Sequence, residues 1–394
     1  MKERIIKMNA DYIIQNGRVI DPATNTDEIR DLIICNNKIK DSHDGSFISD
    51  HVINAEGCIV VPGLVDFHTH IYYEGSGIGI KPDMMIAQGT TAAVDAGTAG
   101  SSNFGSFYES VVTHSLVKIK SFLTVYSGGQ LDSKLCEDFN PNLYNYERML
   151  RVVDKYHDNI LGLKIRISKG VVPDNKAKDY LNAAINLSEK INAQLGTKLT
   201  LCVHTTNSPI TASELASCLR PGDIFCHCFQ GNGNNIILGD GYIAPGILEA
   251  RKRGVLFDAA NGKGNFGLAT AKRALEQGFI PDIISSDLTN DKFNIPPYDK
   301  NFLTILSKYL TLGLDLMTLL KTATSTPAKL MGLEGQIGTL KPGSIADVAI
   351  LKLKNVNLIH KDWKDDELHA KQLLVPQMTI CNGEIQFCQN DFWL

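Results

Sequence analysis

The sequence predicts an α/β protein, a (β/α)₈ TIM-type barrel with a small β-sandwich domain built from both termini. In the middle of the chain, short apolar, β-branched segments alternate with amphipathic helical ones. Histidine, lysine and aspartate follow several of these segments at their C-terminal ends, where a parallel barrel gathers its site. Both ends of the chain instead carry β-prone segments separated by turn residues. We therefore expect a β-sandwich from residues 1–60 and 337–394, and a barrel from residues 61–336.

The first sixty residues have the pattern of β-hairpins. "DYIIQNGRVI" and "DLIICNNKIK" place Asn-Gly and Asn-Asn between β-prone segments, which favours tight turns. A matching pattern returns near the C-terminus, where "SIADVAILKL", "LLVPQMTI" and "EIQFC" surround "CNGE". Because one half cannot bury its apolar face alone, we expect the two ends to form one β-domain.

The barrel strands are expected at eight places. They are residues 59–66, 90–96, 120–127, 160–167, 199–204, 223–228, 254–259 and 281–286. Helical periodicity separates them, for example in "NYERMLRVVDKYH", "AKDYLNAAINLSEKINAQL", "LATAKRALEQG" and "NFLTILSKYLTLG". After the last of these, "TSTPAKLMGL" and "GTLKPGS" lead back to the β-domain.

Composition and charge limit the kinds of molecule that the protein is expected to bind. The chain has 394 residues and a net charge of −4, without a basic run that would suit nucleic acid or a membrane surface. We expect a small-molecule substrate. Its N-terminus lacks the continuous apolar core of a secretory signal, and its nine cysteines form no paired framework, so we expect a cytoplasmic protein.

Six candidate metal ligands stand at the ends of the apolar segments. They are His68, His70, Lys164, His204, His227 and Asp287. A single His-x-His is no stronger evidence for a metal than for two ordinary polar residues, but four further candidates at matching strand ends favour the metal. Because four histidines and one aspartate exceed what one catalytic zinc binds, they suit two divalent ions, and zinc accepts these ligands well.

Lys164 is the unusual member of this set, since an ammonium would repel both ions. Burial and neighbouring cations lower the pKa of a lysine, and a neutral amine reacts with carbon dioxide. The product, N6-carboxylysine, is a carboxylate that can bridge two cations. The alternative is an ordinary exposed or ion-paired lysine, which its place between Leu163 and Ile165 disfavours.

Other polar residues allow two interpretations each. Asp287 is the preferred general base, taking the proton from the attacking water, or it is a ligand only. Arg166 either binds a substrate carboxylate through two parallel hydrogen bonds or makes a structural ion pair. Strand alternation places Cys226 and Cys228 opposite His227, toward the helices, and places Cys202 one layer below His204. We expect all three to be packed thiols rather than ligands.

The whole chain resembles the amidohydrolase superfamily. The resemblance rests on "PGLVDFHTH", the lysine of the fourth strand, the two later strand-end histidines, the "SSDL" aspartate and "ATSTPAKLMGL…GTLKPGSIADVAIL". It implies that His68, His70 and Asp287 hold one metal, that His204 and His227 hold the other, and that carbamylated Lys164 bridges them. Relatives are often dimers or larger assemblies, which allows a homo-oligomer, although no residue pattern identifies an interface.

Within the superfamily the chain is most similar to a dihydroorotase-like or deacetylase-like group. "GLKIR", "HCFQG" and the loop after "LFDAANGKG" carry that similarity, which implies esterases for acetylated α-hydroxy acids such as acetyl-(R)-mandelate. Asn261 stands where such relatives are expected to have a histidine. We therefore expect Asn261 to bind the substrate, and we expect the choice of substrate to differ from that of these relatives. Tyr72 occupies the position of the dihydroorotase arginine, and "HTTN" and "HCFQ" lack the His-x-x-Glu of deaminases.

The resulting expectation is a binuclear metal-dependent hydrolase that cleaves a small carboxylated ester or amide with a hydroxide shared by the metals. Deacetylation of acetylated α-hydroxy or amino acids is the first candidate reaction. The second is cyclic amide hydrolysis, as in dihydroorotase and hydantoinase, because both reactions use the same metal ligands. A catalytically inactive barrel that serves as an assembly scaffold is a third alternative, disfavoured because no candidate ligand is lost.

Overall fold

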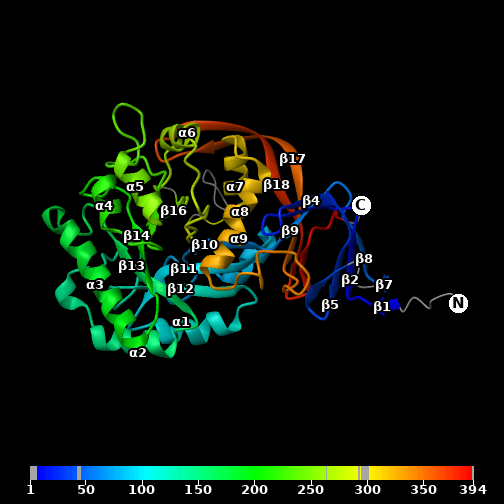
Figure 1. The fold of residues 1–394 in the computed structure, drawn as a ribbon, viewed down its shortest axis with the longest axis horizontal. Coiled ribbons are helices and arrows are strands. Elements are labelled where there is room, and N and C mark those ends of the chain that lie inside the picture. The colour runs from blue at the N-terminus through cyan, green and yellow to red at the C-terminus, as the bar shows by residue number, and fades with distance from the viewer. Residues whose placement is uncertain are drawn as a thin grey trace.

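The computed structural model describes residues 7–41, 46–132, 134–262, 264–291, 293 and 301–392, and a curled parallel sheet lies at its centre (Figure 1). Seven strands pair in chain order, each parallel to the next. They are β10 (Leu64–Thr69), β11 (Thr90–Gly100), β12 (Lys118–Thr124), β13 (Ile160–Arg166), β14 (Thr200–His204), β15 (Ile224–Cys226) and β16 (Leu256–Asp258).

The eighth expected strand, residues 281–286, closes the barrel through isolated bridges rather than as a regular strand. Ile283 bridges Asp258 at the end of β16, and Leu288 bridges Thr69 at the end of β10. The N–H of Asp287 also donates to the carbonyl of His68 at 2.7 Å. The sheet is therefore a closed barrel, and the predicted fold class is confirmed.

The first expected strand, residues 59–66, is two strands. β9 (Ile59–Pro62) belongs to a sheet of the terminal domain, and β10 begins two residues later. Gly63 lies between them, where a Cβ atom would come within 2.2 Å of Thr91 Oγ1. Only glycine fits this close approach, and the chain passes from one sheet to the other at this residue. The division at residues 60 and 336 stays a prediction.

Helices lie on the outside of the parallel strands (Figure 1). They are α1 (Phe104–Ser110), α2 (Tyr146–Lys155), α3 (Ala177–Leu195), α4 (Ala212–Cys218), α5 (Pro245–Arg253), α6 (Leu268–Glu276), α7 (Phe302–Thr311), α8 (Leu316–Ala323) and α9 (Ser325–Leu330). Short 3₁₀ helices occupy η2 (Pro82–Gln88), η3 (Val112–His114), η4 (Pro141–Leu143) and η5 (Asp174–Lys176).

The four helices predicted from periodicity are confirmed within about two residues at either end. Local residues set their limits. Asn145 accepts a hydrogen bond from the N–H of Arg148 at the start of α2, and Gly196 adopts the left-handed conformation that ends α3.

The described part of the terminal domain has three sheets, and the largest of them combines strands from both ends of the chain. A six-stranded sheet has the order β19-β18-β17-β9-β3-β4, a four-stranded sheet the order β6-β5-β2-β8, and β1 pairs with β7. Their bounds are β1 (Lys7–Asn9), β2 (Tyr12–Gln15), β3 (Arg18–Asp21), β4 (Thr26–Ile29), β5 (Leu32–Cys35), β6 (Lys38–Lys40), β7 (Ser46–Ile48), β8 (Val52–Asn54), β17 (Val348–Lys361), β18 (Glu367–Cys381) and β19 (Glu384–Cys388). Val19, Ile34, Ile350 and Ile380 share one apolar cluster, so the two ends are buried together.

Two of the three expected turns form hairpins. Asn36 and Asn37 join the antiparallel strands β5 and β6, and Asn382 and Gly383 join β18 and β19. The hairpin expected at Asn16 and Gly17 is wrong, because β2 and β3 lie in different sheets. A Cβ atom on Gly17 would lie 2.5 Å from Val60 Cγ2, so this glycine permits a tightly packed crossing between sheets.

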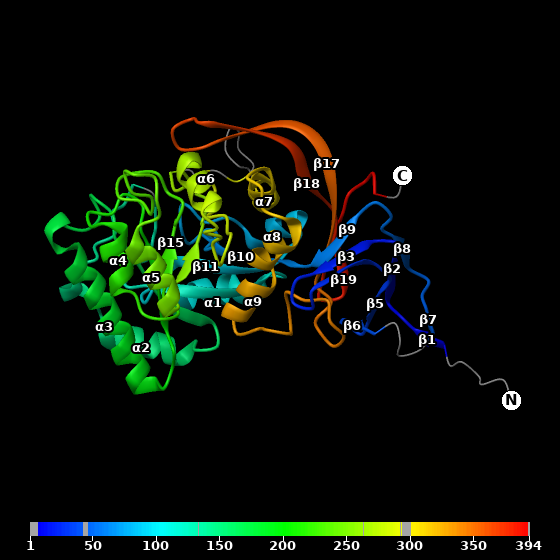
Figure 2. The same ribbon diagram turned by 45° about the horizontal axis from the view of Figure 1, so that its top comes forward.

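β17 and β18 extend well beyond the strands expected from the sequence and form a long hairpin arm that arches over α6 and α7 (Figure 2). The arm is fastened at two places. The N–H of Leu268, the first residue of α6, donates to Asp362 Oδ2 at 2.9 Å, and the N–H of Leu374 donates to Ser307 Oγ in α7 at 2.9 Å. The arm therefore contacts helices that follow the last barrel strands.

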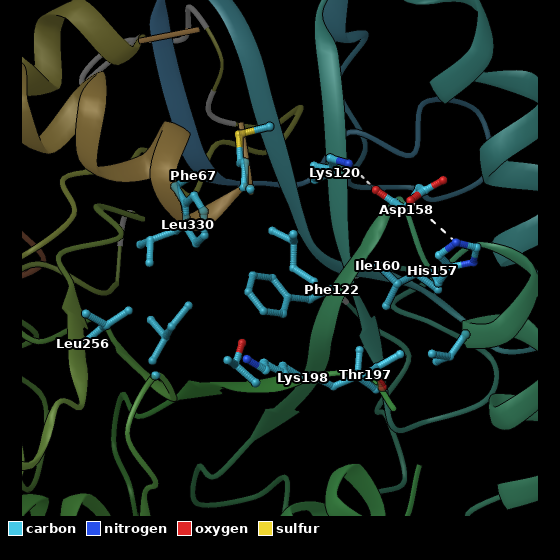
Figure 3. A pocket seen from close by; sticks show the side chains of 18 residues that line it. Phe67, Lys120, Phe122, His157, Asp158, Ile160, Thr197, Lys198, Leu256 and Leu330 are labelled. Atoms are coloured by element: carbon cyan, nitrogen blue, oxygen red, sulfur yellow. Dashed lines mark hydrogen bonds and ion pairs between the residues drawn. The ribbon is translucent and has the colours of Figure 1, made fainter. Parts of the chain in front are cut away.

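The end of the barrel where the strands begin contains a cavity of about 490 Å³ (Figure 3). Residues at the beginnings of the strands line it, among them Ile160, Ile224 and Leu256, and Phe67 and Phe122 reach into it from deeper in the barrel. Since this is the N-terminal face, it lies away from the predicted ligands. Among the described residues, no helix combines the length and apolarity needed to cross a bilayer.

Candidate active site

The structure brings all six candidate ligands to the C-terminal end of the barrel. His68 lies in β10 and His70 just after it, Lys164 lies in β13, and His204 ends β14. His227 directly follows β15, and Asp287 lies in the closing segment. Five of the six are buried, and His204 is partly exposed. Their roles as ligands stay predictions, but their convergence is what those roles require.

His68, His70 and Asp287 form one close group. The Nε2 atoms of His68 and His70 lie 3.6 and 3.3 Å from Asp287 Oδ1. One ligand atom from each residue lies within 4.8 Å of the other two, a spacing that one metal ion can span.

Each of three histidines is anchored through its Nδ1 atom. His68 Nδ1 lies 3.0 Å from Asp258 Oδ2, His70 Nδ1 lies 2.8 Å from Thr98 Oγ1, and His227 Nδ1 lies 2.9 Å from the carbonyl of Ala260. Metal-binding histidines are typically held in this way, because a hydrogen bond at one ring nitrogen fixes the other as the free donor. The anchoring partners therefore leave the Nε2 atoms for a metal.

His204 and His227 lie beside each other on the other side of this group. Their ring centroids are 4.3 Å apart, and His68 and His227 are separated by 5.2 Å. His227 Nε2 is buried and has no hydrogen-bond partner among the described residues. A buried polar atom without a partner is costly, and a cation at this place would satisfy it. The donors present thus fit divalent metal ions.

Three of the histidines, His68, His204 and His227, are neutral at ordinary pH. Burial lowers the pKa of His227 to about 3 and holds the pKa values of His68 and His204 well below their usual value. Since only the neutral imidazole binds a metal, these histidines are already in the form that ligation requires.

Lys164 lies within this group, with Nζ 3.3 Å from His68 Nε2 and 3.4 Å from Cys202 Sγ. Burial lowers the pKa of Lys164, but Cys202, Cys226 and Asp287 raise it, and the net direction is upward. Without metal the amine is therefore held as an ammonium, and the lowered pKa expected from the sequence is not found. Divalent cations in the same cavity would act in the opposite sense.

Backbone strain marks the loops that carry these groups. His227, Ala260 and Asp287 have φ values of 59°, 38° and 52°, in the region that favours glycine. Each costs roughly 1–3 kcal/mol and persists only where the surroundings impose it. Strain at three such positions is typical of a functional site.

The two predicted substrate-binding residues already have protein partners. Arg166 Nη1 lies 2.5 Å from Glu137 Oε2, which is the ion pair that the sequence analysis kept as an alternative. Asn261 donates to the carbonyl of Ser285 and accepts from the hydroxyl of Tyr309, each at 2.9 Å. Their substrate-binding roles stay predictions.

Three positioning residues escaped the sequence analysis, namely Asp258, Thr98 and Asn265. Asn265 Nδ2 donates to Asp287 Oδ2 at 2.7 Å, so it fixes the carboxylate that is the predicted general base. Asp258 ends β16 within the quoted segment "LFDAANGKG", and its strand-end position is the one signal that could have identified it.

The expected orientation of Cys226 is wrong. Cys226 Sγ lies 3.2 Å from Cys202 Sγ inside the barrel, whereas Cys228 packs in the cluster that includes the outer helices, as expected. Strand alternation does not extend past Cys226, because β15 ends there and His227 has a positive φ. His227 and Cys226 can therefore both face the barrel interior.

Comparisons with known proteins agree with this geometry. The Amidohydrolase family model matches residues 230–385. A deacetylase of Agrobacterium fabrum is 29% identical over 340 residues, which are 84% of this chain and 80% of that protein. A deacetylase of Enterococcus faecalis is 26% identical over 96% of this chain and 99% of its own length. A dihydroorotase of Geobacter metallireducens is 26% identical over 87% and 90% of the two chains.

Solved structures give the same picture of the fold. An adenine deaminase superposes with a TM-score of 0.85 at 24% identity, covering 96% of this chain and 100% of that one. A dihydroorotase superposes with a TM-score of 0.81 at 25% identity, covering 96% and 99%. Together, the comparisons support the assignment of the chain to the amidohydrolase superfamily and its assignment as a hydrolase.

Proposed function

We propose that this protein is a binuclear metal-dependent hydrolase that removes acetyl groups from acetylated α-hydroxy or amino acids. The observation that carries the proposal is the set of Nδ1-anchored histidines whose Nε2 atoms converge on Asp287 and Lys164. The deacetylase relatives, which align over most of the chain, supply the reaction class.

In this proposal His68, His70 and Asp287 hold one divalent ion, and His204 and His227 hold a second. Lys164, as N6-carboxylysine, bridges the two, and zinc suits the donors. When bound, the ions would supply a water activated for attack and an electrophile for the scissile carbonyl.

Asp287 moves the proton. Its Oδ2 accepts from Asn265 while its Oδ1 faces the two histidines of β10, so the carboxylate is held in one orientation. It takes a proton from the attacking water as the new C–O bond forms. It returns that proton to the leaving oxygen or nitrogen as the acyl bond breaks, which gives acetate and the free hydroxy or amino acid.

Arg166 recognises the substrate carboxylate in this proposal. Its side chain is 29% exposed at the mouth of the barrel. A guanidinium has five N–H donors, and the contact with Glu137 uses the Nη1 atom. The pair also holds the guanidinium in place before substrate arrives, which lowers the cost of binding.

The second candidate is cyclic amide hydrolysis, favoured by the dihydroorotase relative and its superposition. Comparing hydrolysis of acetyl-(R)-mandelate and dihydroorotate by zinc-loaded protein separates the two. We expect the acetyl ester to be the faster substrate. Faster turnover of dihydroorotate would favour the second candidate. Inactivity toward acetyl-(R)-mandelate, dihydroorotate and N-acetylated amino acids alike would contradict a deacetylase.

A matched pair of variants ties the measured activity to this site. Asp287→Asn removes the proposed base and should lower kcat by about 10²-fold or more. Asp291→Asn changes an exposed carboxylate four residues away and should leave kcat near that of the unchanged protein. Equal effects of the two substitutions would place the activity elsewhere.

A further inference from the structure

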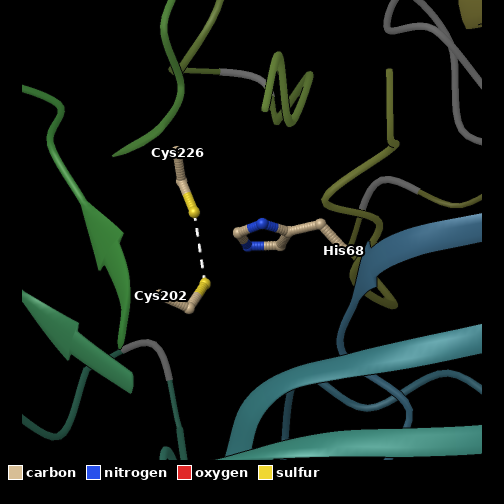
Figure 4. Close-up of side chains that lie close together, drawn as sticks. All are labelled: His68, Cys202 and Cys226. Atoms are coloured by element: carbon tan, nitrogen blue, oxygen red, sulfur yellow. Dashed lines mark hydrogen bonds between the residues drawn. The ribbon is translucent and has the colours of Figure 1, made fainter. Parts of the chain in front are cut away.

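Two buried thiols lie directly below the candidate metal centre. Cys202 in β14 and Cys226 at the end of β15 are 1% and 0% exposed, with their Sγ atoms 3.2 Å apart (Figure 4). The strands that carry them are adjacent and parallel, and His204 pairs with Cys226 in their register. The barrel itself therefore holds the two sulfurs together.

A third donor faces the same pair from across the barrel. The imidazole of His68, on β10, points toward the space between the two sulfurs (Figure 4). One ring nitrogen of His68 and the two Sγ atoms all lie within 4.8 Å of one another. One imidazole and two thiols from three different strands thus surround a single point.

The side chain of Lys164 brings a positive charge to this group. Its Nζ lies 3.4 Å from Cys202 Sγ and 3.3 Å from His68 Nε2. The donors therefore already face a cationic group. A metal ion entering among them would have to displace that ammonium, because the two charges repel each other.

We propose that His68, Cys202 and Cys226 form a binding site for one thiophilic cation. Soft cations such as Cd²⁺ and Cu⁺ prefer thiolate ligands, whereas the two-metal centre above offers imidazole and carboxylate, which suit Zn²⁺. On binding, each thiol releases its proton to solvent and forms a metal–sulfur bond. The site is distinct from the two-metal centre except for the shared His68.

Sharing His68 makes occupation of the two sites mutually exclusive. Its Nδ1 is engaged by Asp258, so one free nitrogen cannot serve an ion below it and an ion beside His70 and Asp287. A thiophilic cation in the lower site would therefore inhibit the enzyme. This consequence rests on the proposed function, whereas binding itself rests only on the three donors.

Cadmium binding to chelator-treated, full-length protein tests the site. We expect a cadmium–thiolate charge-transfer absorption band in the ultraviolet that is lost in Cys202→Ser/Cys226→Ser. The matched control is Cys228→Ser, which changes a thiol that is equally buried but packs outside this group, and it should retain the band in full. Persistence of the band in the double variant, or its loss in the control alone, would overturn the proposal.

X-ray absorption at the cadmium edge on the unsubstituted protein gives a result that does not depend on how the variants fold. Sulfur neighbours around cadmium support the site, and a shell of nitrogen and oxygen alone refutes it, leaving Cys202 and Cys226 as packed thiols. Activity is measured separately. Failure of zinc-loaded, cadmium-free protein to hydrolyse any acetyl ester would refute the proposed function, whereas cadmium–sulfur binding in the cadmium-loaded sample would still support the thiol site.

Discussion

At the scale of single residues, the candidate centre depends on which ring nitrogen each histidine presents. Asp258, Thr98 and the carbonyl of Ala260 each engage an Nδ1 atom, and the Nε2 atoms of His68 and His70 are thereby directed toward Asp287. Burial keeps the imidazoles of His68 and His227 neutral. Lys164 brings a positive charge to the cavity beside the Asp287 carboxylate, so the chemistry of this one amine decides how many cations the cavity can hold.

Replacement of Lys164 tests its bridging role. Lys164→Ala should reduce the metal content from about two ions per chain to about one, because the shared anionic ligand is lost. Mass spectrometric metal analysis measures this, and exposed Lys169→Ala is the control. Added short carboxylic acids should restore the second ion. Unchanged two-metal occupancy in Lys164→Ala without such acids would contradict the carbamate.

The candidate ligands could be predicted from the sequence because each follows an apolar strand segment, and strand ends of a parallel barrel converge. Their orienting partners could not. Asp258 lies 190 residues from His68 in the chain, and only the closed barrel brings them together. The facing of Cys226 was mispredicted for a local reason, since the positive φ of His227 interrupts the alternation that the prediction used.

At the scale of elements, the seam between β10 and the closing segment is held by a buried acid. Asp66 Oδ1 accepts from the N–H of Ser286 at 3.0 Å, and burial raises the pKa of Asp66 to about 7. The ordinary value is 3.8, so the folded protein keeps a proton that the unfolded chain loses as the pH rises.

This shift predicts a pH-dependent loss of stability. Below the ordinary pKa both states are protonated and nothing is lost. Between about pH 4 and pH 7 the unfolded chain ionises first, so the free energy of unfolding of the metal-free protein should fall relative to that of Asp66→Asn and level off above pH 7. Denaturant unfolding of both proteins across this range measures it. A difference that rises with pH, or is constant, would contradict the assignment.

The hairpin arm of β17 and β18 makes a separate prediction. The first residue of α6 is capped by Asp362 from the arm, because the residue before the helix, Gly267, has no side chain for the purpose. Asp362→Ala should therefore lower the free energy of unfolding by about 1 kcal/mol. Asp366→Ala, exposed on the same tip, is the control. Equal unfolding energies for the two variants would show that the cap contributes nothing.

The elements that the sequence predicted well are those whose burial produces a regular pattern. α3 begins and ends at the residues expected because its apolar positions recur with helical spacing and Gly196 follows. The arm was missed beyond residue 353, since many side chains of that part of β17 are exposed and give no continuous apolar signal. The segment expected as the eighth strand does lie beside β16 and β10, but it pairs with them through single bridges and forms no regular strand.

At the scale of the whole molecule, the two ends of the chain meet in one domain that is bound to the barrel through buried polar contacts. Asp347, 1% exposed, pairs with Lys118 of β12 at 2.8 Å. Within the domain, Asp21 Oδ2 accepts from the hydroxyl of Thr339 and the N–H of Leu340, which joins the two ends of the chain. Because the arm from this same domain reaches the helices near the mouth, we expect the two parts to unfold together.

In the proposed function, hydrolysis requires two divalent ions at the barrel mouth. Titration of chelator-treated protein with Zn²⁺, followed by hydrolysis of acetyl-(R)-mandelate and by metal analysis, tests it most directly. We expect no activity before zinc is added and a plateau at about two ions per chain. Full activity in protein that contains no metal would contradict it.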